Sequence, residues 1–244
     1  MILLVMFVAL LALILLNVPI AVSLGVVAMF AMAATSGIGG LPNAALVLYS
    51  GSMKFALIAI PLFILAGAIM NASGISRRLI DLASALVGFI RGGLAMVTVS
   101  ASLFFAEMSG SAVADVAALG SILIPAMKRR GYPTPFAAAV TSSSATLAVI
   151  IPPSIPMILY GVMSGSSVVE LFVAGIIPGA MMVGGMMLVA FVICTKNGWG
   201  HLIRLEIARV LKTGIGAWLG FFAIGLVLWG IYTGKFSPTE AAGV

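Results

Sequence analysis

The sequence predicts an all-α, polytopic membrane protein. Only 18 of the 244 residues are charged, 12 Lys and Arg against 6 Asp and Glu, whereas about 25% of an ordinary soluble domain is charged. Apolar types make up 63% of the chain, and the mean hydropathy is +1.30. A soluble fold needs far more polar surface, so the soluble globular, disordered and nucleic-acid-binding classes are excluded. At about 20 residues per span, the chain can form about six or seven membrane helices at most.

The remaining composition narrows the kind of site that the chain can build. A single cysteine, Cys194, excludes an intramolecular disulfide and a metal site built from cysteines. The net charge of +6 is explained by basic residues, which collect in the cytoplasmic loops of membrane proteins. We therefore expect the lipid bilayer as a partner and no nucleic acid.

The first apolar segment leaves two interpretations open. Residues 2–35 are interrupted only by Asn17, Pro19 and Ser23, and one helix of this length would run about 50 Å through a core of about 30 Å. Either a tight turn at Asn17–Pro19 separates two short spans, or Pro19 kinks one long helix. After a loop with a short helix, residues 55–73 read as a clear span.

An amphipathic helix is predicted next, over residues 75–90. Its charged side chains, such as Arg77 and Asp81, alternate with leucine and isoleucine, a pattern typical of a helix that lies in the membrane interface.

Two short apolar arms follow, residues 92–108 and 112–127, with Ser109-Gly110-Ser111 between them. Each arm is slightly too short for a full crossing. Arg91 precedes the first arm and Lys128-Arg129-Arg130 follows the second, so both ends carry the basic residues of cytoplasmic segments. The pair is predicted to be a re-entrant hairpin.

A broken helix is predicted over residues 133–165, where Pro152-Pro153-Ser154 lies near the middle. Adjacent prolines remove amide donors and free upstream carbonyls, so the helix must unwind. Unwound backbone at membrane depth is tolerated only where it is buried in protein or lines a water-filled cavity.

The distribution of basic residues supports one orientation. Three Lys and Arg lie in residues 77–91, three in 128–130 and four in the charged loop 196–212, giving ten on the predicted cytoplasmic face. Lys54 and Lys235 are the two on the other face. This asymmetry follows the positive-inside rule.

The hairpin tip and the helix break are the features that carry chemistry. Both expose helix ends, whose carbonyls can supply oxygen ligands to sodium and whose amides attract a carboxylate. Opposed ends of broken helices near the midplane mark the site of a secondary transporter. The alternative is that the glycines and serines only allow close helix packing.

Two acids lie within the hairpin arms, Glu107 just before the tip and Asp115 one turn after it. An ionised side chain at membrane depth costs about 2.5–3.5 kcal/mol on insertion scales, so each is a functional candidate. Either could instead pair with a basic residue or face water.

Intramembrane proteases are excluded by the same inventory. A serine protease needs a histidine within a span as its base, and His201 lies in the charged loop. An aspartyl protease needs acids on two facing spans, whereas Glu107 and Asp115 share one hairpin.

Five stretches of the chain stand out as motifs: Ile60-Pro61-Leu62-Phe63-Ile64-Leu65-Ala66-Gly67, Phe104-Phe105-Ala106-Glu107-Met108-Ser109-Gly110-Ser111, Ile150-Ile151-Pro152-Pro153-Ser154-Ile155, Gly175-Ile176-Ile177-Pro178-Gly179 and Phe236-Ser237-Pro238-Thr239-Glu240-Ala241-Ala242. In this order they resemble the large membrane subunit of tripartite ATP-independent periplasmic (TRAP) transporters. The resemblance covers essentially the whole chain. It implies a permease of a sodium-coupled importer of organic acid anions in the bacterial inner membrane, working by an elevator mechanism with a periplasmic substrate-binding protein and a small membrane subunit. Sodium is the only ion implied, and no other cofactor is expected.

The resemblance also assigns domains and sites. The family's subunit has two inverted repeats, and this chain is expected to hold the first repeat and a truncated start of the second. The expected domains are scaffold spans 1–73, an interfacial arm helix 74–91, a transport domain 92–166 (hairpin 92–130, broken helix 133–165), a closing span 167–195, a cytoplasmic loop 196–213 and the second repeat's start 214–244. Expected substrate-binding residues are Ser109, Gly110, Ser111, Pro153 and Ser154. Expected sodium-binding residues are Ser109, Gly110, Ser111, Asp115, Ser143, Ser144, Pro152 and Ser154.

The alternatives are a carboxylate carrier of the same elevator architecture that needs no binding protein, and a fragment that does not transport on its own.

Overall fold

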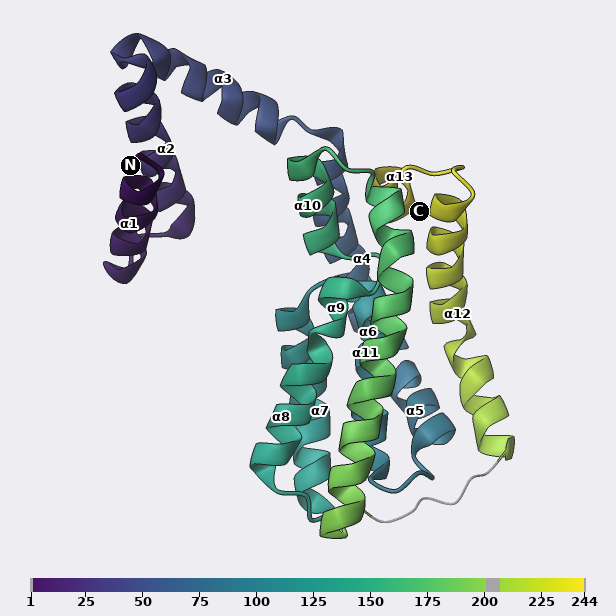
Figure 1. Ribbon diagram of the computed structural model, residues 1–244. Helices are drawn as coiled ribbons and strands as arrows, with labels where there is room; N and C mark the ends of the chain where they lie inside the picture. Colours follow the sequence, from purple (N-terminus) through teal and green to yellow (C-terminus); the bar gives the residue numbers. More distant parts are fainter. Residues whose placement is uncertain (1, 201–206, 244) are drawn as a thin grey trace. The chain divides into compact units, whose positions relative to one another are not determined.

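A computed structural model describes residues 2–200 and 207–243, without the side chains of residues 108, 109 and 207 (Figure 1). His201 lies outside the described residues. Every regular element in the described ranges is helical, in agreement with the predicted all-α class. The chain divides into two compact units, Met1–Lys54 and Phe55–Val244.

The first unit begins with a helical hairpin. Helices α1 (Ile2–Leu15) and α2 (Ile20–Ser36) are separate and in contact, and Asn17 at the turn has a φ of 62°, which asparagine tolerates better than most residues. The structure therefore has the tight turn, not one kinked helix. The apolar side chains of α1 are exposed around the helix, as expected of a surface in lipid. A 3₁₀ turn, η1 (Ile38–Gly40), and α3 (Leu41–Ser52) complete the unit.

The second unit opens with the expected span. The 3₁₀ helix η2 (Phe55–Ile58) and α4 (Ala59–Ala72) form one helical stretch of 18 residues, apolar apart from Asn71. Pro61 lies in the first turn of α4, where its missing amide costs no helical hydrogen bond.

Helix α5 (Ile75–Val87) is amphipathic, as predicted. Leu79 and Ala83 are fully buried, while Arg77 and Asp81 are exposed. Its apolar face packs against helices α6 and α12. Its placement in the membrane interface stays a prediction.

The hairpin and the broken helix form the centre of this unit. Helix α6 (Gly93–Ser109) contacts α7 (Ala112–Arg129) and α8 (Thr134–Ala145). After α8 come α9 (Leu147–Ile150) and α10 (Ile155–Ser164). Buried side chains from both parts, including Met96, Val99 and Leu147, share one core cluster.

Two long helices follow, and they extend into the residues expected to form the loop 196–213. Helix α11 (Val168–Asn197) is continuous through Pro178, and α12 (Ile207–Tyr232) begins before the expected residue 214. Alanine, arginine, leucine and lysine in the first turns of α12 are good helix formers, and the exposed Arg209 and Lys212 do not oppose helix formation. A short helix, α13 (Pro238–Gly243), packs on α4.

Three helices among the described residues are long and apolar enough to cross a membrane: Phe55–Ala72, Val168–Asn197 and Ala208–Tyr232. A fourth span is counted if Thr134–Ile150 and Ile155–Ser164, bent by 41°, act as one. The shorter apolar helices Ile2–Leu15, Ile20–Ser36 and Gly93–Glu107 accompany them. The chain has the composition and helices of a multi-pass membrane protein.

Candidate functional site

The hairpin tip is a two-residue turn that exposes two helix ends. Gly110 ends α6 in the left-handed region, with φ 56°, and its N–H donates to the Ala106 carbonyl at 3.2 Å. Ser111 is extended and caps α7, since its hydroxyl accepts from the Ala114 N–H at 3.5 Å. The carbonyl end of α6 and the amide end of α7 therefore meet at the tip. The side chain of Ser109 lies outside the described side chains.

The break between α9 and α10 is as local as the prolines predict. The Pro152-Pro153 peptide is cis, and Ser154 is extended and fully buried. The Ser154 hydroxyl donates to the Val149 carbonyl at 2.7 Å. This bond joins the two sides of the break, because Val149 lies in α9 and Ser154 precedes α10.

The tip and the break lie in direct contact. A Cβ atom added to Gly110 would lie 3.2 Å from the Ile155 amide nitrogen and 3.4 Å from the Pro153 carbonyl oxygen. The structure thus brings together two segments some forty residues apart in the chain, each with exposed helix ends. Gly110 permits this approach because it has no side chain and adopts a positive φ.

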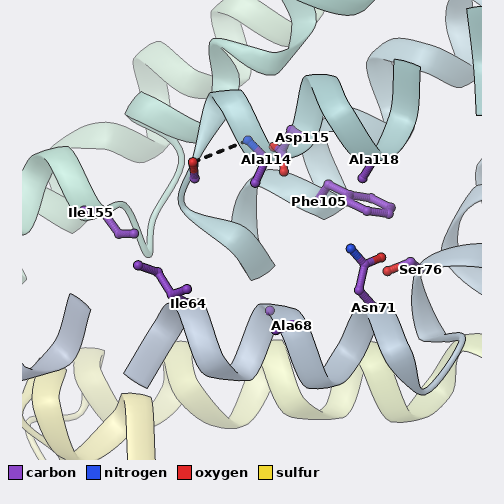
Figure 2. Close-up of a pocket in the computed structure, with 11 residues that line it drawn as sticks. Ile64, Ala68, Asn71, Ser76, Phe105, Ala114, Asp115, Ala118 and Ile155 are labelled. Carbon is purple, nitrogen blue, oxygen red and sulfur yellow. Dashed lines mark hydrogen bonds between the residues drawn. The ribbon is translucent and has the colours of Figure 1, made fainter. Parts of the chain in front are cut away.

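A cavity of about 330 Å³ opens beside the tip (Figure 2). Asp115 of α7, 1% exposed, and Ser111, the cap of α7, line it on one side, and Ile155 lines it from the far side of the break. Asn71 of α4 and Ser76 of α5 face Asp115 across it. The Ser76 hydroxyl is buried and has no hydrogen-bond partner among the described residues. The cavity is therefore lined by several oxygen-bearing side chains.

Sequence reasoning missed Asn71 and Ser76. Asn71 is a polar residue near the end of an otherwise apolar helix, which was a usable signal. Ser76 carried none, because a serine in an amphipathic helix is ordinary.

Two expected sodium ligands lie elsewhere in α8. Ser144 is fully buried, and its hydroxyl lies 2.7 Å from that of Ser102 in α6. The exposed Ser143 donates to the Ala139 carbonyl at 2.7 Å and lines a separate cavity with Phe136. The structure does not bring either serine to the cavity beside the tip.

Glu107 lies on the other side of the hairpin from Asp115. It lines a cavity of about 470 Å³ together with Pro153, and another of about 380 Å³ together with Pro152 and Tyr232. The two acidic side chains therefore line different cavities around the same hairpin tip.

The described residues hold no cluster of three or more histidine, cysteine or acidic side chains that could bind a metal ion. A cation at the tip would have to rely on backbone carbonyls, hydroxyls and one carboxylate, a set that suits a hard cation.

Comparison with known proteins identifies the family. Residues 7–244 match the model of the family described as "Tripartite ATP-independent periplasmic transporter, DctM component". The chain belongs to the DctM family. The resemblance predicted from the sequence motifs is thereby confirmed.

Curated DctM relatives match over most of this chain. The C4-dicarboxylate TRAP transporter large permease protein DctM of Pseudomonas aeruginosa is 42% identical over 200 residues, 82% of this chain and 47% of the relative. The sialic acid permease SiaM of Vibrio cholerae is 38% identical over 228 residues, 93% and 53% of the two chains. The 2,3-diketo-L-gulonate permease YiaN of Escherichia coli is 43% identical over 206 residues, 81% and 46%. The chain spans about half the length of these relatives, which are named as transporter permeases and not as enzymes.

Proposed function

We propose that this DctM chain forms part of the permease of a sodium-coupled, binding-protein-dependent importer of organic acid anions. The contact between the hairpin tip and the helix break carries this proposal. A coupled carrier needs ion and solute ligands in one place, and here Gly110 lies against Pro153 and Ile155. Discontinuous helices with opposed ends are the usual way to build such a site at membrane depth.

The groups at the contact between tip and break can bind both a sodium ion and the carboxylate of a solute. The carbonyls at the end of α6 and within the break are oxygen donors that a sodium ion can use without a full buried negative charge. The amide end of α7 at Ser111 is a partial positive charge that favours a carboxylate. The cavity beside Asp115 provides space next to these groups.

The remaining parts of the proposal concern motion and partners. An elevator mechanism would move the hairpin and broken helix as one body, and their shared core cluster supports this. We assign the chain to the bacterial inner membrane, where a periplasmic binding protein would deliver solute and a small membrane subunit would support the scaffold. Relatives named for C4-dicarboxylate and sialic acid make carboxylates the first solutes to test.

The proposed hairpin is re-entrant, so both its ends face the cytoplasm. Single cysteines at Arg91 and Arg130, with Cys194 replaced by serine, should both react with an impermeant maleimide only from the cytoplasmic side. Reaction from opposite sides would contradict this topology.

The experiment that tests the function is uptake into proteoliposomes by the complete permease, with its small subunit and binding protein. We expect saturable uptake of an organic acid that requires an inward sodium gradient and the binding protein. Uptake that is unchanged when sodium is replaced by choline would contradict the coupling. Uptake that needs sodium but no binding protein would favour the binding-protein-independent carrier.

A further inference from the structure

The Glu107 carboxylate is a negative charge beside the proposed site with no partner in the described part of the chain. Neither a hydrogen bond nor an ion pair joins it to a described residue. The described residues that line its two cavities include no lysine, arginine or histidine. Burying a carboxylate without a compensating charge is costly, so an acidic residue at membrane depth suggests a functional role.

The position of Glu107 in its helix increases that cost. It lies in the last turn of α6, which ends at Ser109. The carbonyl end of a helix carries a partial negative charge, so an acid there is disfavoured and a cation is favoured. A cationic group beside Glu107 would therefore be favoured both by the carboxylate and by the end of α6.

A bare metal ion is poorly served on this side of the hairpin. Among the described side chains, Tyr232 is the only other polar one in the 380 Å³ cavity, and the 470 Å³ cavity has none besides Glu107. The walls of the larger cavity are apolar and include Phe63 and Phe222. Small hard cations need about six oxygen ligands, so an ion here would depend almost entirely on backbone carbonyls, which the proposed sodium site at the tip and the break already uses.

An organic ammonium group fits the same surroundings better. Its N–H groups can donate to the carboxylate, its carbon chain can contact the apolar walls, and the Tyr232 ring can attract the charge through its face. A cavity of this volume is large enough for a small organic solute. Pro153 lines the larger of these cavities and Pro152 the smaller, so a solute on Glu107 would also reach the break.

We infer that Glu107, with Tyr232 beside it, binds a cationic nitrogen of the transported solute, and that the substrate class is a carboxylate that also carries an ammonium group. This inference rests on the proposed function, because the carboxylate of the solute would bind at the tip and the break. A dicarboxylate would place its second negative charge near Glu107 and bind more weakly.

The test compares three four-carbon solutes that differ only in one end group: 4-aminobutyrate, butyrate and succinate. Their dissociation constants are measured by thermal unfolding of the purified full chain in detergent with sodium, which removes the selection made by the binding protein. We expect 4-aminobutyrate to bind about tenfold more tightly than succinate, the effect of one charge-assisted contact.

Variants separate the charge from the fold. Glu107→Gln should weaken the binding of 4-aminobutyrate by about tenfold and strengthen the binding of succinate. Tyr232→Leu should weaken the binding of 4-aminobutyrate alone. Glu170→Gln is the matched control, because Glu170 is an exposed glutamate in the first turn of α11 and its loss removes the same charge. It should leave the preference among the solutes as it is.

The two ways of failing are distinct. If succinate binds as tightly as 4-aminobutyrate, or if Glu107→Gln leaves their ratio unchanged, the inference about Glu107 is wrong while the carboxylate site stands. If none of the three solutes binds in a sodium-dependent way, and the complete permease takes up no carboxylate, both the inference and the proposed function are wrong.

Discussion

Replacing Gly110 by alanine perturbs the contact between tip and break with the smallest possible side chain. Two costs can be worked out from the structure. The φ of 56° is a left-handed conformation that costs a non-glycine residue about 1–2 kcal/mol. The new Cβ would also lie 3.2 Å from the Ile155 amide nitrogen and 3.3 Å from its Cγ1, so the tip must move by some tenths of an ångström. Such overpacking costs about 1–3 kcal/mol, and with the backbone cost we expect about 2–5 kcal/mol in all.

Gly131→Ala is the matched control for this substitution. Gly131 has a φ of 82°, and an added Cβ would meet nothing within 4 Å, so only the backbone cost of about 1–2 kcal/mol applies. Thermal or denaturant unfolding in detergent measures the stability of both variants. Sodium titrations of uptake by the complete permease measure coupling, and Gly110→Ala alone should raise the half-saturating sodium concentration. Equal losses of stability in the two variants, with equal sodium dependence, would refute the reasoning.

Three further predictions concern other contacts. Ser154→Ala removes the bond to the Val149 carbonyl and should cost about 1–3 kcal/mol of stability, with a raised half-saturating sodium concentration in uptake; an unchanged sodium titration would contradict its role. Gly175→Ala would place a Cβ 2.5 Å from the carbonyl oxygen at the end of α9 and should lower the stability of the protein by about 1–3 kcal/mol. The control is Gly184→Ala in the same helix, where the added Cβ meets no atom within 4 Å and the protein should not be destabilised. Hydrogen bonds from Ser237 hold the pKa of the exposed Glu240 below its usual value. The ionised Glu240 side chain should therefore stabilise α13 above pH 4.5, and this stabilisation should be lost as the pH falls through the lowered pKa. Hydrogen exchange of α13 that does not change with pH in this range, after correction for the intrinsic rate, would contradict this prediction.

The parts of the fold that could be predicted from the sequence are those with local causes. Adjacent prolines in the middle of an apolar stretch interrupt the helix there, and Ser109-Gly110-Ser111 between two short apolar arms favours a turn. The tight turn at Asn17 stayed open, because a proline kink and a turn satisfy the same short segment. The start of α12 at Ile207 was placed too late, because charged residues near a membrane helix read equally well as loop or as its first turns.

The parts of the site that escaped prediction depend on distant contacts. Asn71 stands out as a polar residue in an apolar helix, but the sequence does not indicate that it and Ser76 line the cavity of Asp115. The resemblance placed Ser144 among the sodium ligands, but its hydroxyl lies 2.7 Å from that of Ser102 in α6. The separation of Glu107 from Asp115 follows from the helices on either side of the hairpin, which no local pattern reveals.

The central claim is that the tip and the break form one sodium site, and hydrogen exchange of the purified full chain tests it most directly. Amide exchange is measured by mass spectrometry in sodium chloride and in choline chloride at equal ionic strength. The account predicts that sodium slows exchange in residues 108–113 and 150–156 together, because one ion would order both segments, and that Gly110→Ala shifts both to higher sodium concentration. Slower exchange in only one of these segments, or in neither, would contradict it.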